Sequence, residues 1–167
     1  MIRKKLCMVG AFAVGKTSLV QRYVSSIYTE KYHTTVGVKV DKKIVPMNEH
    51  PVHLLLWDLA GEDMYAQLNM AYLRGMAGYV LVVDGTRRAT LTKGIEIVRR
   101  CREQYPQAFA LAAMNKLDLQ ADWEVTETDM AELRREGVEV YLTSAKTAQS
   151  VDELFARAAH RAIVDNV

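Results

Sequence analysis

The chain has 167 residues, which suits a single domain over residues 1–167 with a sizeable core. Its composition, 50% hydrophobic and 25% charged, is ordinary for a globular protein. Its formal charge of +2 is too small to indicate a nucleic-acid or anionic-membrane partner. The two cysteines, Cys7 and Cys101, are too few for a disulfide framework or a metal cluster. We therefore expect reduced thiols in or near the core, which suits a cytoplasmic protein.

The two ends of the chain resemble targeting sequences only in part. Basic residues at 3–5 followed by an apolar run over 6–14 imitate a secretory signal peptide, but cleavage there would destroy the glycine-rich loop described below. No run approaches the roughly 18 apolar residues of a membrane span, and the last three residues hold no cysteine for prenylation. We expect a cytoplasmic monomer without a lipid-anchor signal, unless the C-terminus has been cut short.

Hydrophobic periodicity predicts the elements in chain order. Strands are expected over residues 2–9, 36–45, 52–57, 78–83, 108–114 and 138–142, and helices over 16–24, 64–73, 89–104, 126–135 and 151–163. Residues 46–51 are predicted to form a turn, which makes the strands on either side an antiparallel hairpin. Gly137 is placed to end the fourth helix, and Ser150 with Glu153 predicts a capping box for the last one.

The alternation of strands and helices runs through the chain without a repeat or a low-complexity linker. It predicts an α/β fold, a mostly parallel, doubly wound sheet with helices on both faces. Ligands of such sheets bind outside the carboxyl ends of the strands. Because the loops 10–17, 58–62, 115–118 and 144–146 all follow predicted strands, we expect them to meet at one site.

The first of these loops carries the pattern G-x-x-x-x-G-K-[ST] over Gly10–Ser18. Small residues let the backbone turn tightly, and the amides that open the following helix converge on a concave anion site that fits a polyphosphate. Lys16 would reach the β- and γ-phosphates, and the Thr17 hydroxyl would bind Mg²⁺. The alternative is a chance match in a turn rich in glycine and alanine.

The second loop reads Asp58-Leu59-Ala60-Gly61. A carboxylate at the end of an apolar strand, across from the first loop, can hold Mg²⁺ through water. Gly61 lets its backbone N–H approach the γ-phosphate without a Cβ clash. Taken alone, an Asp and a Gly after a strand also fit an ordinary turn.

The third loop, Asn115-Lys116-Leu117-Asp118, has the groups to select a guanine base. Asp118 can accept both the N1–H and the exocyclic amine of guanine, whereas adenine would leave the carboxylate desolvated and unpaired, at a cost of about 3–5 kcal/mol. Asn115 would bond the base and tie the loops together, and the Lys116 stem would cover one face of the ring. A polar loop with this pattern by chance is the alternative.

The fourth loop, Ser144-Ala145-Lys146, follows the last predicted strand. The amide of Ala145 could donate to the guanine oxygen O6, and Ser144 could brace Asp118. Three such residues are weak evidence alone, and gain weight as the fourth motif in this order.

With these four motifs and Thr35-Val36-Gly37, the chain resembles a Ras-superfamily small GTPase, closest to the Rab and Rho branches. The resemblance covers essentially the whole chain. It implies a P-loop NTPase fold, a six-stranded sheet with one antiparallel strand and five main helices, with GTP or GDP and Mg²⁺ as cofactors. It assigns the nucleotide to Gly10, Ala13, Val14, Gly15, Lys16, Thr17, Ser18, Tyr28, Tyr32, Thr35, Gly61, Asn115, Lys116, Asp118, Ser144, Ala145 and Lys146, the metal to Thr17, Thr35 and Asp58, and catalysis to Glu62, Lys16, Gly61 and Thr35.

The resemblance also implies two switch segments, about 25–40 and 59–73, which signal the nucleotide state to effector, exchange and activating proteins. Thr35 would bind Mg²⁺ through its hydroxyl and the γ-phosphate through its amide in the GTP state. Tyr28 would pack edge-on against the guanine, where the family more often has Phe, and Tyr32 could close over the phosphates. Both tyrosines also fit ordinary exposed loop residues.

Two departures from the family pattern concern hydrolysis. Glu62 stands where the family usually has a Gln that orients the attacking water, so it could still accept a hydrogen bond but adds a negative charge beside the γ-phosphate. Phe12 stands where a small residue is common and would crowd an activator's arginine. The sequence therefore predicts a slow GTPase switch. The alternatives are a GTP-loaded scaffold, the G domain of a larger protein, or an ATP- or nucleoside-phosphorylating enzyme, against which Asn115–Asp118 argues.

Overall fold

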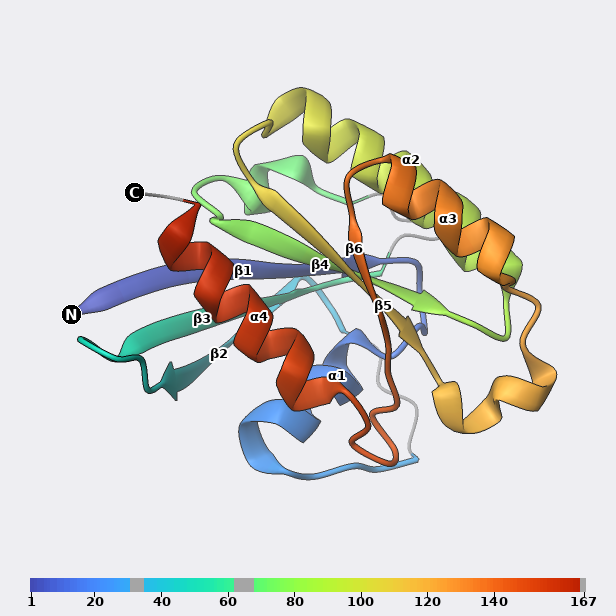
Figure 1. Ribbon diagram of the computed structural model, residues 1–167, viewed down its shortest axis with the longest axis horizontal. Helices are drawn as coiled ribbons and strands as arrows, with labels where there is room; N and C mark the ends of the chain where they lie inside the picture. The colour runs from blue at the N-terminus through green and yellow to red at the C-terminus, as the bar shows by residue number, and fades with distance from the viewer. Residues whose placement is uncertain (31–34, 62–67, 166–167) are drawn as a thin grey trace.

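The computed structural model describes residues 1–30, 35–61 and 68–165. This part of the chain forms a six-stranded sheet in the order β2-β3-β1-β4-β5-β6 (Figure 1). The strands are β1 (Ile2–Gly10), β2 (Val38–Val45), β3 (Val52–Leu59), β4 (Gly78–Asp84), β5 (Phe109–Asn115) and β6 (Glu139–Leu142). The β2–β3 pair is antiparallel and the other pairs are parallel, so the predicted α/β fold and its hairpin are confirmed.

Helices cover both faces of the sheet (Figure 1). The α-helices of the described residues are α1 (Lys16–Ser25), α2 (Arg88–Gln104), α3 (Glu127–Arg135) and α4 (Val151–Val164). Helices α1 and α4 pack on one face, where the rings of Tyr23 and Phe155 stack at 4.2 Å, and α2 and α3 pack on the other. In the part of the chain described, no helix has the length and apolar character to cross a membrane.

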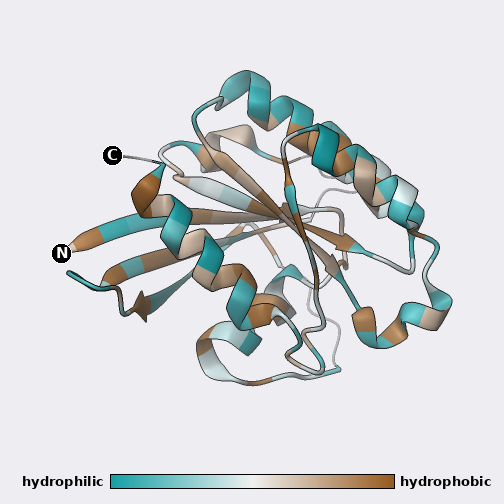
Figure 2. Cartoon of the chain, viewed as in Figure 1, coloured by the Kyte–Doolittle hydropathy of each residue, from teal (hydrophilic) through white to brown (hydrophobic). Residues whose placement is uncertain are grey.

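The central strands feed two hydrophobic cores, because successive side chains of a strand point to opposite faces. In β1, Leu6 and Met8 join the core beneath α1 and α4, whereas Cys7 and Val9 join the core beneath α2 and α3. Figure 2 shows brown on the strands at the centre of the sheet and much teal on the helices around them. Cys7 and Cys101 are buried and free, as expected, and burial raises the pKa of each thiol to about 12, so neither is a reactive thiolate.

The helix predicted over 64–73 is shorter in its described part. Residues 62–67 lie outside the described residues, and Met70–Leu73 form a single 3-10 turn, η1, in place of an α-helix. The side chain of Asn69 caps this turn by accepting the Ala71 amide at 3.0 Å. A second 3-10 helix, η2 (Leu117–Asp122), was not predicted, since its residues show no apolar period.

The predicted capping box at Ser150 is wrong. Ser150 has φ 59°, in the left-handed region, and its side chain makes no cap hydrogen bond. A capping box needs an extended N-cap residue whose hydroxyl faces the third amide of the helix. Thr126 has that conformation ahead of α3, and its hydroxyl and the Asp129 carboxylate exchange hydrogen bonds with each other's backbone.

Strand boundaries moved by a few residues at the edge that holds the loops. Strand β2 begins at Val38, because Gly37 has φ +72°, which is not an extended conformation. The Gly37 carbonyl still accepts the Ala60 amide at 2.9 Å. The loops 10–15, 60–61, 116–118 and 143–146 follow the carboxyl ends of β1, β3, β5 and β6. Parallel strands place these ends at one rim, as predicted.

Candidate functional site

The loop between β1 and α1 has the backbone geometry that an anion site needs. Gly15 is the N-cap residue of α1 with φ +101° and no side-chain cap, so the first amides of the helix are open to a ligand. A Cβ on Gly15 would lie 2.4 Å from Nδ2 of Asn115, which explains why the position needs glycine. Ala13 takes φ +62°, a conformation that costs a non-glycine residue about 1–2 kcal/mol and must be held by its surroundings.

Lys16 is buried at the bottom of this loop. Its ammonium donates to the carbonyls of Ala11 at 2.7 Å and Gly10 at 3.3 Å. Burial lowers its pKa from 10.5 to about 8; the Asp58 carboxylate opposes that shift and Arg87 adds to it. The Lys16 ammonium is only partly compensated by nearby negative charge, so a bound anion would stabilise it and raise its pKa again.

Three oxygen-bearing side chains meet beside the loop. The Thr17 hydroxyl donates to Oδ2 of Asp58 at 2.6 Å and lies 2.7 Å from the Thr35 hydroxyl. Asp58 is 1% exposed, and burial raises its pKa against the opposing effects of Thr17 and Lys16. Its Oδ1 is buried and has no hydrogen-bond partner among the residues that the structure describes.

This donor set fits a hard divalent cation such as Mg²⁺. Hydroxyl and carboxylate oxygens are its preferred ligands, and it keeps several waters or phosphate oxygens in addition. The unpartnered Oδ1 of Asp58 can accept from such a water. Among the described residues, no group of three or more His, Cys, Asp or Glu side chains could hold a metal. A cation bound by Thr17, Thr35 and Asp58 would therefore also need oxygens from water or from a bound molecule.

Gly61 closes the site from the β3 side. A Cβ at this position would lie 2.5 Å from Cα of Phe12 and 2.9 Å from the Ala11 carbonyl oxygen. The sequence predicted that glycine is needed here for close approach to a phosphate. In the structure the backbone of the loop between β1 and α1 already excludes a side chain here.

At the other end of the site, Asn115 ties the loops together as predicted. Its Nδ2 donates to the Val14 carbonyl at 3.0 Å, and its Oδ1 accepts the Thr143 hydroxyl at 3.2 Å. The side chain is buried, so both bonds are made away from water. They join the loops that follow β1, β5 and β6 into one unit.

Ser144 braces Asp118, which was also predicted. The Ser144 hydroxyl donates to Oδ1 of Asp118 at 2.7 Å and accepts the Thr147 amide at 3.1 Å. Asp118 is exposed at the rim while Ser144 is buried. The carboxylate is thus oriented before any ligand arrives, with oxygen lone pairs left to accept from one.

Two adjoining cavities form the site. One lies over the loop 12–18 and the other between Asn115, Asp118 and Ala145, and they share Gly15, Ser18, Tyr28 and Lys116 as lining residues. The anion site and the oriented carboxylate therefore lie along one continuous depression.

The comparisons with known proteins agree with this geometry. Residues 5–164 match the family model described as Ras family. The chain belongs to the Ras family. It is 35% identical to GTP-binding protein ypt5 of Schizosaccharomyces pombe over 158 residues, which are 92% of this chain and 75% of the relative. It is 33% identical to Ras-related protein Rab-5A of Dictyostelium discoideum over 159 residues, covering 94% and 79%, and 34% identical to human Ras-related protein Rab-31 over 153 residues, covering 90% and 78%.

In this Rab-like small GTPase of the Ras family the remaining predicted residues lie as follows. Tyr28 lines both cavities, with the Arg22 guanidinium 5.9 Å from its ring. The Lys146 ammonium pairs with Glu30 at 3.0 Å, which raises the pKa of Lys146. Tyr32 and Glu62 lie outside the described residues.

Two arginines that hold the loops of this Ras-family site were missed from the sequence. Arg22 of α1 donates to the carbonyls of Ala145 and Lys146, each at 2.7 Å. Arg87 holds the loop after β1, together with Asp84 at the end of β4. Asp84 is the last residue of an apolar strand and Asp58 is the second-last residue of another, and a carboxylate in that position was the available sequence clue.

Proposed function

We propose that this chain is a molecular switch that binds GTP or GDP with Mg²⁺ and hydrolyses GTP slowly. The observation that carries the proposal is the pairing of an anion site around Lys16 with an oriented carboxylate, Asp118, in adjoining cavities. A guanosine polyphosphate has the two ends that match these groups.

In this proposal the phosphate end works through charge. Lys16 and the first amides of α1 offset the negative charge of the β- and γ-phosphates. Thr17, Thr35 and Asp58 would hold Mg²⁺, which would supply positive charge to offset the charge developing on the phosphates. Because Thr35 lies in segment 25–40, its contacts with the γ-phosphate would order that segment only in the GTP state, and Gly61 would do the same for segment 59–73.

The test is nucleotide binding followed by single-turnover hydrolysis. Labelled GDP, GTP and ATP are titrated with and without Mg²⁺, and the GTP complex is then followed by chromatography. We expect tight, Mg²⁺-dependent binding of GDP and GTP, none of ATP, and conversion of bound GTP on the order of 10⁻⁴ s⁻¹, the scale for such a domain without an activator. Folded protein that binds ATP as well as GTP, or neither, would refute the proposal.

A GTP-loaded scaffold is the second candidate, and Glu62 favours it. A carboxylate can accept a hydrogen bond from the attacking water, but it also repels the charge of the transition state. Single-turnover rates of wild type and Glu62→Gln separate these effects, and equal rates would mean that Glu62 has no catalytic role. GTP that survives purification on the wild-type protein supports the scaffold, whereas GDP supports the switch.

Phe12 also favours the GTP-loaded scaffold, for a different reason. It lines the phosphate cavity beside Gly61, where a partner's arginine would have to enter. We propose that an activating protein with an ordinary arginine finger stimulates this chain little. Stimulation should rise in Phe12→Gly, and a large stimulation of wild type that Phe12→Gly leaves unchanged would contradict this.

A further inference from the structure

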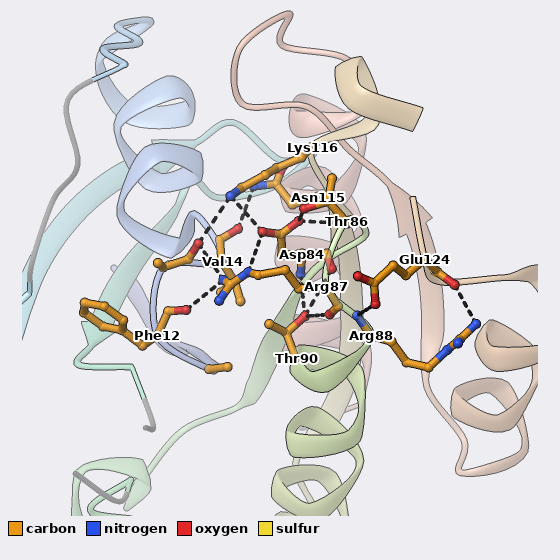
Figure 3. Close-up of polar contacts among 12 residues, drawn as sticks. Phe12, Val14, Asp84, Thr86, Arg87, Arg88, Thr90, Asn115, Lys116 and Glu124 are labelled. Atoms are coloured by element: carbon orange, nitrogen blue, oxygen red, sulfur yellow. Dashed lines mark hydrogen bonds and ion pairs between the residues drawn. The ribbon is translucent and has the colours of Figure 1, made fainter. Parts of the chain in front are cut away.

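Arg87, the residue before α2, reaches from the end of β4 to the phosphate-binding loop (Figure 3). Its Nη2 donates to the carbonyls of Phe12 at 2.9 Å and Ala13 at 3.0 Å. Its Nε donates to Oδ2 of Asp84 at 3.0 Å. One guanidinium thus joins two consecutive peptide groups of the loop to a carboxylate in the sheet.

Asp84 is a rigid anchor for that guanidinium. The carboxylate is 1% exposed, and its Oδ1 accepts the amide and the hydroxyl of Thr86 at 2.9 and 2.7 Å. Its Oδ2 also pairs with the Lys116 ammonium at 2.8 Å, and that ammonium lies 3.4 Å from the Ala13 carbonyl. Burial alone would raise the pKa of Asp84, but the hydrogen bonds from Lys116, Thr86 and Arg87 lower it overall, so the anchor is charged.

The loop needs such an anchor at this point. Ala13 is held at φ +62°, which alanine rarely adopts. In a trans peptide the C=O and the following N–H point in opposite directions. Fixing the carbonyls of Phe12 and Ala13 on the outside therefore fixes the amides of Ala13 and Val14 on the inside.

We propose that Arg87 is a positioning residue that aims the amides of the phosphate-binding loop and so slows the release of guanine nucleotide. Arg87 does not line either cavity and acts through the loop backbone. This inference rests on the proposed function, because it concerns the same nucleotide. It adds a determinant of nucleotide retention that lies outside the four motifs.

The chain offers a matched control in the next residue. Arg88 turns the other way (Figure 3), its Nη2 donating to the Glu124 carbonyl at 2.6 Å and its Nε to Asp129 at 3.2 Å. The two arginines have similar exposure, 44% and 51% of the side chain. Replacing either removes one exposed cation near the start of α2, but only Arg87 contacts the loop.

The experiment measures dissociation of labelled GDP in Mg²⁺ for wild type, Arg87→Ala, Arg87→Lys and Arg88→Ala, with thermal unfolding of each complex. We expect release to be about ten-fold faster in Arg87→Ala. It should be intermediate in Arg87→Lys, whose three N–H donors lie on one nitrogen and cannot span the two places where Nε and Nη2 of Arg87 bind, and unchanged in Arg88→Ala. Wild-type release from Arg87→Ala, or equal acceleration by Arg88→Ala, overturns the inference.

A double-mutant cycle with Ala13→Gly separates positioning from general support of the fold. Glycine adopts φ +62° without strain, so the loop depends less on Arg87, and Arg87→Ala should speed GDP release by less than three-fold in that background. Full additivity of the two substitutions would overturn the inference. If wild type itself binds no guanine nucleotide, the proposed function fails and this inference with it; if wild type binds and Arg87→Ala matches it, only this inference fails.

Discussion

The site has a base end, formed by Asn115, Asp118 and Ser144, and a phosphate end, formed by Lys16 and Asp58 with the loop between β1 and α1. The two ends differ in how many of their polar groups already have hydrogen-bond partners within the protein. At the base end, Asn115 bonds to Val14 and Thr143, and Ser144 holds Asp118 in place. At the phosphate end, Lys16 donates to carbonyls of its own loop, and within the described residues Oδ1 of Asp58 has no hydrogen-bond partner. The base end is finished before a ligand binds, whereas the phosphate end is completed by the ligand.

This difference divides the work between specificity and energy. A preorganised carboxylate rejects a wrong base because that base would cover the carboxylate without donating hydrogen bonds to it. Unsatisfied groups at the phosphate end gain the most when polyphosphate and cation arrive, so this end should respond to pH and metal. Changes at the base end should alter which nucleotide binds, and changes at the phosphate end should alter the conditions under which any nucleotide binds.

The largest expected effect is at the base end. Asp118→Asn replaces two acceptor oxygens by one and places an NH₂ against the guanine donors, so we expect GDP affinity to fall by about 3–5 kcal/mol, roughly 10²- to 10⁴-fold. Asp122→Asn is the control, since Asp122 is exposed in the same 3-10 helix. Titration of labelled GDP measures both, and a loss below three-fold in Asp118→Asn would break the comparison.

A smaller effect is expected when the metal side of the phosphate end is changed. Asp58→Asn keeps the shape of the side chain but removes the charge behind the cation. The Mg²⁺ concentration that halves the GDP release rate should rise about 10- to 100-fold, as for partners that bind a metal through water. Asp122→Asn again serves as the control. An unchanged Mg²⁺ requirement would show that Asp58 has no part in holding the cation.

Ser144→Ala tests whether orientation of Asp118 by the protein matters. Asp118 is exposed, so water can replace the lost hydrogen bond, and we expect GDP affinity to fall by only about 1 kcal/mol, roughly five-fold. Ser150→Ala removes a nearby hydroxyl that makes no cap hydrogen bond and should have no effect. Equal GDP affinities of wild type and Ser144→Ala would mean that Asp118 needs no brace.

The base end was also the part of the site that the sequence described best. The sequence predicted that Asn115 ties the loops together and that Ser144 braces Asp118, because these short polar side chains lie where the neighbouring strands β5 and β6 end at one rim. The strand order and both cores follow from apolar runs in the same way. Where one side chain binds another, as Ser144 binds Asp118, both residues must be of particular types, and these types can be recognised in the sequence.

Contacts to backbone leave no such pattern. Arg87 bonds to carbonyls 74 and 75 residues away, and every residue carries a carbonyl, so nothing in the sequence marks the acceptor. The capping box misplaced at Ser150 has the same origin, because the motif was present but the left-handed φ of the residue was not foreseeable from it. The sequence therefore did not predict the backbone conformation at non-glycine positions such as Ser150, nor which carbonyls a long side chain such as Arg87 would reach.

The smallest expected effect concerns the charge of Lys16. As the pH rises, this residue should make the free protein more stable but weaken its binding of GDP. Without ligand the pKa of Lys16 is about 8, below its usual 10.5, so the unfolded chain binds more protons than the folded one between these two values. The contribution of Lys16 to the free energy of unfolding therefore increases as the pH rises from about 8 to 10.5. A bound phosphate raises the pKa, so binding takes up a proton. GDP affinity should therefore fall about four-fold from pH 7 to about 8.5. Calorimetry at pH 8 in buffers of different ionisation enthalpy should detect roughly half a proton taken up per GDP, and an affinity that is flat across this range without proton uptake would mean that Lys16 is already fully charged in the empty site.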